Sequence, residues 1–251
     1  MTTRERADRL LVARGLFESR ARAQAAIAAG RVTADGVPVR RSSDEISRTA
    51  AIEAAPEHPY VSRGGVKLAA ALDHFHLDIA GRVCLDVGAS TGGFSEVMAL
   101  RGARRVYAVD VGSDQLHPRL RDDETIVSLE KTDIRALDAG RLVERPDFAT
   151  VDVSFISLKL VLPAVARLVN PCATLLALIK PQFEAGRRDF RQDIKQRIKK
   201  GIVRDGAVHA AVCDDISAFL TRLDWRIGGL APSAIPGGDG NREFFVEAER
   251  G

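Results

Sequence analysis

The chain has 251 residues, 45% of them hydrophobic, and a formal net charge of +3, which suits one large domain or an ordinary domain with a small one. No apolar run approaches the roughly 18–20 residues that span a bilayer, and the polar N-terminus does not resemble a secretory signal. Cys84, Cys172 and Cys213 are far apart and form neither a metal-binding spacing nor a disulfide framework. We therefore expect a cytoplasmic protein with free thiols and no metal site.

Positive charge is concentrated near the N-terminus. Residues 1–42 contain nine arginines and four acidic residues, and the guanidinium fork of arginine binds two phosphate oxygens at once. This distribution fits a nucleic-acid-binding segment, and it also fits an ordinary solvated surface.

The same 42 residues are predicted to form two short helices and a hairpin. Apolar residues at helical spacing predict a first helix that Gly15 ends. Ser19 is a suitable N-cap for a second helix over 20–29, and Asp35-Gly36 favours a tight hairpin turn. The polar stretch 43–59 that follows is expected to be a linker.

Short motifs in this segment resemble the alpha-L RNA-binding domain of a small-subunit ribosomal protein, pseudouridine synthases and tyrosyl-tRNA synthetase. The matching stretches are 9–16, 19–20, 29–32 and 35–36. The resemblance implies that residues 1–42 bind RNA through arginines, which are otherwise surface residues. The candidates are Arg4, Arg14, Arg20, Arg22 and Arg31, with Arg63 after the linker.

Strands and helices alternate from residue 82 onward. Strands are expected at 82–86, 105–110, 126–129, 148–151 and 174–179, and helices at 93–101, 159–168 and 205–223, with a charged loop over 184–200. This alternation predicts an α/β fold with a mostly parallel sheet and helices on both faces. The last two strands, near 225–230 and 243–248, are joined by too short a loop for a crossover helix and should pair antiparallel.

A glycine-rich loop follows the first of these strands, where backbone N–H groups can meet a cofactor. Its spacing, Gly-x-x-x-Gly-Gly, differs from the Gly-x-Gly-x-x-Gly of dinucleotide enzymes. Asp110 ends the next strand, where it can accept hydrogen bonds from ribose hydroxyls. Asp133 follows the strand after that and could accept a hydrogen bond from an adenine amino group. We interpret the loop as an S-adenosylmethionine site, with NAD still open on these residues alone. The predicted cofactor-binding residues are Asp86, Gly88, Ala89, Ser90, Thr91, Gly92, Gly93, Phe94, Asp110, Asp133 and Asp152.

Charged residues mark the same edge of the predicted sheet. Asp152 and Lys180 end neighbouring strands, and Glu243 begins the antiparallel last strand, so all three should meet in one crevice. Lys67 lies in the first turn of a helix predicted after Gly65, where a cation opposes the helix dipole. Each of these residues alone is more often a surface charge or half of an ion pair.

Together the four residues resemble the Lys-Asp-Lys-Glu tetrad of ribose 2'-O-methyltransferases of the FtsJ type. Residues 60–65, 152–158, 180–184 and 240–244 match motifs of the TlyA (haemolysin A) family. The resemblance covers nearly the whole chain and implies a Rossmann-like class I methyltransferase domain over 60–251, behind a small α+β RNA-binding domain. Ser113-Asp114 and Asp133 depart from the residues that the family usually has.

The resemblance also implies S-adenosylmethionine-dependent 2'-O-methylation of cytidine in ribosomal RNA of the small subunit, the large subunit, or both. Ribosomal RNA or ribosomal subunits are the expected partners, with no membrane and no DNA; the oligomeric state is open. A ribose hydroxyl is a poor nucleophile until it shares its proton, so Lys180 is expected to be the base. Its neutral form would be favoured by repulsion from Lys67, with Asp152 and Glu243 holding the two lysines.

Three other functions compete with this hypothesis. A non-catalytic RNA-binding or ribosome-assembly protein is disfavoured because the four charged residues are intact. A membrane-damaging haemolysin lacks support, since the sequence shows no clear lytic amphipathic helix. An NAD-dependent dehydrogenase is disfavoured by the loop spacing.

Overall fold

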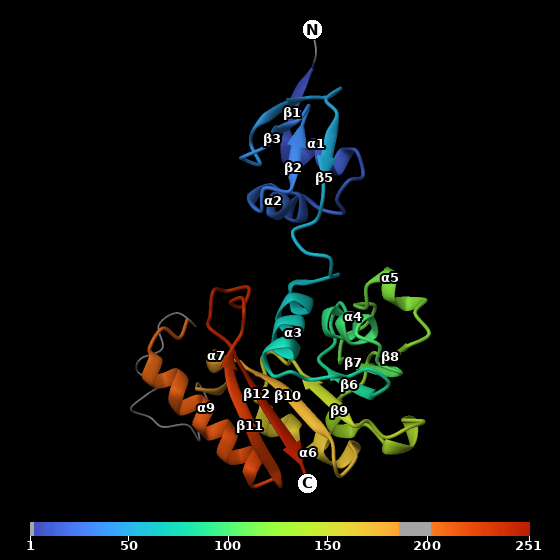
Figure 1. Cartoon of the computed structure of the whole chain (residues 1–251), viewed down its shortest axis with the longest axis vertical. Helices are drawn as coiled ribbons and strands as arrows, with labels where there is room; N and C mark the ends of the chain where they lie inside the picture. Colours follow the sequence, from blue (N-terminus) through green and yellow to red (C-terminus); the bar gives the residue numbers. More distant parts are fainter. Residues whose placement is uncertain (1–2, 186–201) are drawn as a thin grey trace. The chain divides into compact units, whose positions relative to one another are not determined.

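The computed structural model describes residues 3–185 and 202–251 of the chain. The chain divides into two compact units, Met1–Pro59 and Tyr60–Gly251, whose elements are labelled in Figure 1. Of the charged loop predicted over 184–200, residues 186–200 lie outside the described part of the chain.

The N-terminal unit contains two helices and two small sheets. The helices are α1 (Ala7–Ala13) and α2 (Arg20–Ala28), and the strands are β1 (Arg4–Arg6), β2 (Val32–Ala34), β3 (Val37–Pro38), β4 (Glu45–Ser47) and β5 (Ile52–Ala54). The predicted boundaries hold: Gly15 follows α1 with a φ of 70°, and the Ser19 hydroxyl caps α2 by accepting from the Arg22 N–H. The hairpin predicted at Asp35-Gly36 is formed by β2 and β3.

The stretch 43–59 differs from its prediction as a linker. It contains β4, which pairs with β1, and β5, which pairs with β2. Both strands are antiparallel to their partners and complete the two sheets. Each is only three residues long, too short for alternation to be detected in the sequence.

A buried carboxylate fastens the two helices of this unit. Asp8, on α1, is fully buried and accepts hydrogen bonds from Arg6, from Arg20 at 2.7 Å and from Gln24 at 2.8 Å. The hydrogen bond from Arg6, with those from Arg20 and Gln24, holds the pKa of Asp8 well below its usual range. Arg20, a predicted RNA contact, is therefore also a structural residue.

The C-terminal unit is built on a seven-stranded sheet in the order β11-β12-β10-β9-β6-β7-β8. Its strands are β6 (Val83–Val87), β7 (Arg105–Val109), β8 (Ile126–Leu129), β9 (Phe148–Val151), β10 (Thr174–Ile179), β11 (Trp225–Pro232) and β12 (Phe244–Arg250). The first five pair in parallel, whereas β12 is antiparallel to both β10 and β11. The predicted mostly parallel sheet with an antiparallel last strand is confirmed.

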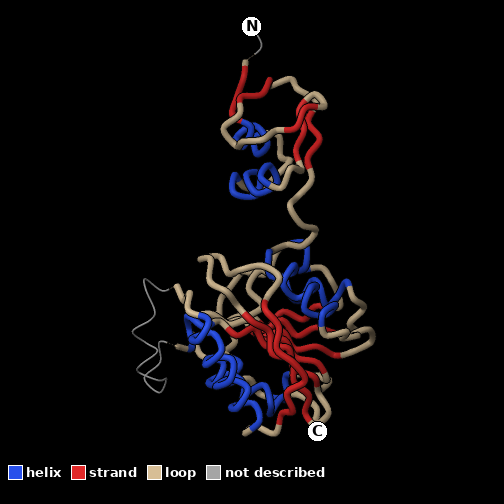
Figure 2. The backbone as a smooth tube through the Cα atoms, turned by 60° about the vertical axis from the view of Figure 1, so that its left-hand side comes forward, coloured by secondary structure: helices blue, strands red, loops and turns tan. Residues whose placement is uncertain are grey.

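Helices cover both faces of this sheet, as predicted (Figure 2). They are α3 (Arg63–His74), α4 (Gly93–Leu100), α5 (Pro118–Arg121), α6 (Leu158–Leu168), α7 (Pro181–Glu184) and α9 (Gly206–Thr221), with 3₁₀ turns at Ile134–Ala136 and Ala139–Arg141. Alternate residues of a strand point to opposite faces: Leu85 packs in the core under α6 and α9, and Cys84 in the core under α3 and α4.

Strand register brings the predicted catalytic residues to one edge. Val87 on β6 pairs with Val151 on β9, and Val151 with Ala177 on β10. Ile179 pairs with Phe244 on the antiparallel β12. The next residue after Ile179, Lys180, and the residue before Phe244, Glu243, therefore leave the sheet at the same edge.

Replacing Asp8 by Ala should destabilise the N-terminal unit selectively. The change removes hydrogen bonds between charged groups, each worth about 1.5–3 kcal/mol, and leaves Arg20 and Gln24 without their acceptor. Hydrogen exchange read by mass spectrometry should show faster exchange in α1 and α2, and unchanged exchange in the C-terminal unit. Glu57→Ala, an exposed carboxylate of the same unit, is the control. Equal exchange in the Asp8 and Glu57 variants would contradict this role.

Candidate functional site

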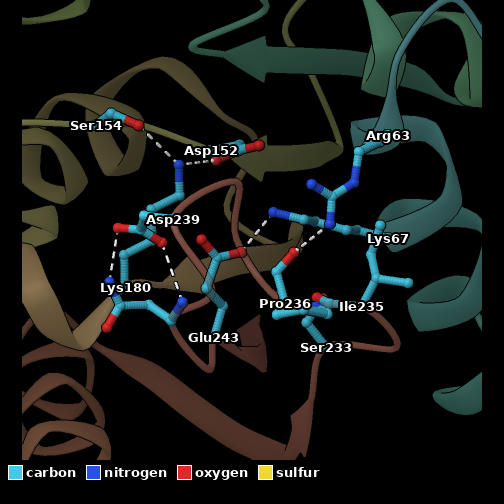
Figure 3. Close-up of polar contacts among 11 residues, drawn as sticks. Arg63, Lys67, Asp152, Ser154, Lys180, Ser233, Ile235, Pro236, Asp239 and Glu243 are labelled. Atoms are coloured by element: carbon cyan, nitrogen blue, oxygen red, sulfur yellow. Dashed lines mark hydrogen bonds and ion pairs between the residues drawn. The ribbon is translucent and has the colours of Figure 1, made fainter. Parts of the chain in front are cut away.

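Lys180 is held by two side chains at the carboxyl end of β9 (Figure 3). Its Nζ lies 2.6 Å from Oδ1 of Asp152 and donates to the Ser154 hydroxyl at 2.8 Å. Parallel pairing of β9 with β10 brings these strand ends together. The amine is thus fixed beside a carboxylate, with only 11% of the side chain exposed.

Lys67 forms a second ion pair, which is more deeply buried. Its Nζ lies 2.5 Å from Oε2 of Glu243, and both residues are buried. Lys67 lies near the start of α3, so Glu243 compensates a cation that the helix dipole disfavours. Removing one partner of such a buried pair costs about 3–5 kcal/mol. The four predicted catalytic residues therefore form two ion pairs, each lysine with its own carboxylate.

Asp239 is a further carboxylate beside Lys180 that the sequence analysis missed (Figure 3). Although burial acts to raise it, the pKa of Asp239 is lowered by hydrogen bonds from Asn241 and by the charge of Lys180. A Cβ on Gly237 would lie 2.6 Å from Oε1 of Glu243 and 3.0 Å from Oδ1 of Asp239. The signal was the Gly-rich run Gly237-Gly238-Asp239-Gly240 itself, because glycines allow backbone to approach side chains closely.

Two cavities open at this edge of the sheet. The first, of about 530 Å³, is lined by Asp110, Asp133 and Phe155 among others, and we call it the Asp110 cavity. The second, of about 340 Å³, is lined by Arg63 and Lys67 among others, and we call it the Lys67 cavity. Gly88, Ser90 and Asp152 line both. The cavities therefore meet where the glycine-rich loop passes the end of β9.

Gly88 makes this meeting possible. Its φ is +84°, and a Cβ there would lie 2.3 Å from the carbonyl oxygen of Asp152. Any other residue would force the loop after β6 away from the backbone after β9.

Asp110 and Asp133 lie where the sequence predicts them. The two oxygens of Asp110 accept from the N–H groups of Ser90 and Gly112, each at 2.8 Å, and a carboxylate has lone pairs for further donors. Asp133 forms an ion pair with Arg135 at 2.6 Å, and hydrogen bonds from Arg135 lower the pKa of Asp133. Both carboxylates line the Asp110 cavity.

The departures Ser113-Asp114 lie in a loop that Glu130 organises. Its carboxylate accepts from the backbone N–H groups of Asp114, Gln115 and Leu116 at 2.7–2.9 Å. Gln115 lines the Asp110 cavity, so Glu130 holds this loop in place beside the cavity.

Five other predicted cofactor residues do not line the Asp110 cavity. Ala89, Thr91, Gly93 and Phe94 line the Lys67 cavity. Gly92 packs on Leu116 and Leu120, where a Cβ would lie 2.7 and 2.5 Å from their side chains.

Asp86 is fully buried beneath the glycine-rich loop. It accepts hydrogen bonds from Ser95 at 2.6 Å and Thr150 at 2.9 Å, and burial raises its pKa to about 7. Since its carboxylate is turned into the core, we now assign Asp86 a supporting role instead of the predicted cofactor contact.

Most of the arginines predicted to bind RNA have partners within the protein. Three of them donate to backbone carbonyl groups: Arg4 to Glu45, Arg14 to Arg48 and Ala50, and Arg63 to Pro236. Two lie beside carboxylates: Arg20 donates to Asp8, and Arg22 lies 3.9 Å from Glu18. Arg31 is exposed. Arg63 also lines the Lys67 cavity.

Comparison with known proteins identifies relatives of both units. Residues 60–250 match the FtsJ-like methyltransferase model and residues 5–52 the S4 domain model. Bacillus subtilis YqxC, described as a candidate rRNA methyltransferase, is 44% identical over 97% of this chain and 85% of its own. The Mycobacterium tuberculosis 16S/23S rRNA (cytidine-2'-O)-methyltransferase TlyA is 40% identical over 98% of this chain and 90% of its own.

A solved structure agrees with these matches. A Streptococcus thermophilus protein described as a candidate hemolysin superposes with a TM-score of 0.74 and 40% identity, covering 100% of this chain and 90% of that one. Within residues 3–185 and 202–251 of the present chain, no helix combines the length and apolar character needed to cross a bilayer.

Asp86 should make the stability of the C-terminal unit depend on pH. Because its pKa rises from 3.8 to about 7 on folding, the folded protein binds this proton more tightly, and stability should fall as pH rises through that interval. Asp86→Asn should flatten this slope. Urea unfolding followed by the fluorescence of Trp225, the single tryptophan and buried in the same unit, measures it. An unchanged slope in the variant would contradict the assignment.

Proposed function

This chain belongs to the TlyA-like branch of the FtsJ-like methyltransferase family, and we propose that it methylates the ribose 2'-oxygen of cytidine in ribosomal RNA with S-adenosylmethionine. The observation that carries the proposal is the junction of the two cavities at Gly88 and Asp152. A cofactor in the Asp110 cavity and a ribose in the Lys67 cavity would meet beside Lys180, which is paired with Asp152.

The Asp110 cavity fits S-adenosylmethionine by its chemistry. Asp110 offers acceptors to the ribose hydroxyls, and Val111, Ile134 and Phe155 supply apolar walls for an adenine. When bound, the cofactor supplies an electrophilic methyl group on a positively charged sulfur. Asp152, at the junction of the two cavities, offers a carboxylate that favours such a cation.

The chain's own residues would prepare the ribose hydroxyl. In its neutral form, Lys180 would accept the proton of the 2'-hydroxyl and become an ammonium, with Asp152 and Ser154 holding its nitrogen at a fixed place. General-base help of this kind contributes about 10²–10⁴-fold. Arg63 would present positive charge to the neighbouring phosphates along the Lys67 cavity, where Lys67 is already paired with Glu243.

The N-terminal unit would hold the RNA. Its S4 match covers residues 5–52, and we propose that Arg31 and the exposed parts of Arg20 and Arg22 contact phosphates of ribosomal RNA. One relative is named for methylation of both 16S and 23S rRNA. Both ribosomal RNAs are therefore substrates to test with this protein. The cytoplasmic location stays a prediction.

The product and the role of Lys180 can be tested together. Ribosomal RNA incubated with the protein and S-adenosylmethionine, then digested to nucleosides, should contain 2'-O-methylcytidine by mass spectrometry. Lys180→Ala should lower its rate of formation about 10²–10⁴-fold, while binding of S-adenosylmethionine, measured by calorimetry, persists.

Lys159→Ala is the matched control, because Lys159 pairs with Asp215 at 2.6 Å outside both cavities. It should leave methylation unchanged. Methylation of a base instead of a ribose, or full activity of Lys180→Ala, would contradict the proposal.

A further inference from the structure

Glu184 is a buried carboxylate one helical turn after Lys180. It ends the short helix α7, which Lys180 begins as N-cap, and only 3% of it is exposed. Its Oε2 accepts from the Ser157 hydroxyl at 2.5 Å, and its Oε1 from the Leu158 N–H at 2.8 Å. Both donors lie at the start of α6, where Ser157 is the N-cap.

The same two stretches of chain are joined again at Lys180. Its amine contacts Asp152 and Ser154, which lie three to five residues before Ser157 in the loop between β9 and α6. Between the two junctions, the rings of Phe155 and Phe183 lie 5.0 Å apart. Residues 180–184 and 152–158 therefore run beside each other, fastened at both ends.

This fastening constrains a strained loop. Phe155 has a φ of +64°, which is unfavourable for a bulky residue and persists only where the surroundings impose it. Phe155 is also 91% exposed, so its ring does little to bury the loop. The hydrogen bonds from Ser157 and Leu158 to Glu184 hold the far end of this loop beside α7.

A buried carboxylate at this place is also favourable in itself. The first N–H groups of a helix have no partner within it, and the helix dipole attracts an anion there. Glu184 satisfies the Leu158 N–H of the 11-residue helix α6. The Glu184 carboxylate therefore lies where a helix favours an acceptor, and its position fixes α6 relative to Lys180.

We propose that Glu184 is a positioning residue, which holds Asp152 and Ser154 against the amine of Lys180 by clamping the loop 152–158 to α7. The catalytic part of this inference rests on the proposed function. The clamp itself can be measured without methyl transfer. The accessibility and reactivity of the Lys180 amine report directly on the clamp.

The test is trace acetylation of the full-length protein by acetic anhydride, with Lys180 and the exposed Lys131 quantified by peptide mass spectrometry. In the parent protein Lys180 should react slowly relative to Lys131. In Glu184→Ala, the relative rate at Lys180 should rise about tenfold, as expected for losing a hydrogen bond between charged and polar groups. Glu184→Gln should restore a slow rate, because its amide oxygen can accept from Leu158 and its NH₂ can donate to the Ser157 hydroxyl.

Arg82→Ala is the matched control for general loosening. The two clamped stretches follow the carboxyl ends of β9 and β10. Arg82 joins the opposite ends of these two strands by donating to Asp147, before β9, and to Thr174, at the start of β10. It should lower stability, read from Trp225 fluorescence in urea, without raising Lys180 acetylation. If Glu184→Ala does not fold, Ser157→Ala removes one hydrogen bond of the clamp and should raise acetylation in the same direction.

Methyl transfer gives the catalytic readout. Glu184→Ala should shift the pH dependence of the methylation rate, Arg82→Ala should not, and Glu184→Ala should cost nothing further in a Lys180→Ala background. An unchanged Lys180 acetylation rate in a folded Glu184→Ala protein, or an equal rise in Arg82→Ala, would overturn the clamp. An inactive parent protein in which Glu184→Ala still raises acetylation would refute the proposed function and leave the clamp standing.

Discussion

The antiparallel pairing of β12 with β10 is the constraint on which the site depends. It carries Glu243 to the edge where the parallel strands end, so that Lys67 of α3 finds its partner there. A buried lysine without this carboxylate would be strongly unfavourable. A slip by one residue would turn Glu243 to the other face of the sheet and remove the pair.

The second constraint is the close approach of two loops at Gly88. Because a side chain at this position would collide with the Asp152 backbone, the glycine-rich loop and the end of β9 share one wall between two cavities. Asp152 faces both cavities and pairs with Lys180. One carboxylate thus links the place of the proposed methyl donor to the amine that would serve the acceptor.

The sequence predicted the parallel sheet, the antiparallel last strand and the edge on which the charged residues meet, because periodicity and strand order carry that information. It did not predict that Lys67 pairs with Glu243 and Lys180 with Asp152, since partner choice depends on register and side-chain direction. Asp86 was expected at the cofactor, yet its position within a strand turns it into the core. The mistaken linker at 43–59 contains strands of three residues, which only their partners reveal.

The most direct test of this account is a crystal structure of the protein with S-adenosylhomocysteine, the demethylated form of the proposed cofactor. The nucleoside of this ligand should lie in the cavity of Asp110 and Asp133, and its sulfur next to Gly88 and Asp152, facing the cavity that Lys67 lines. A ligand whose sulfur lies away from that junction, or whose nucleoside occupies the Lys67 cavity, would contradict it.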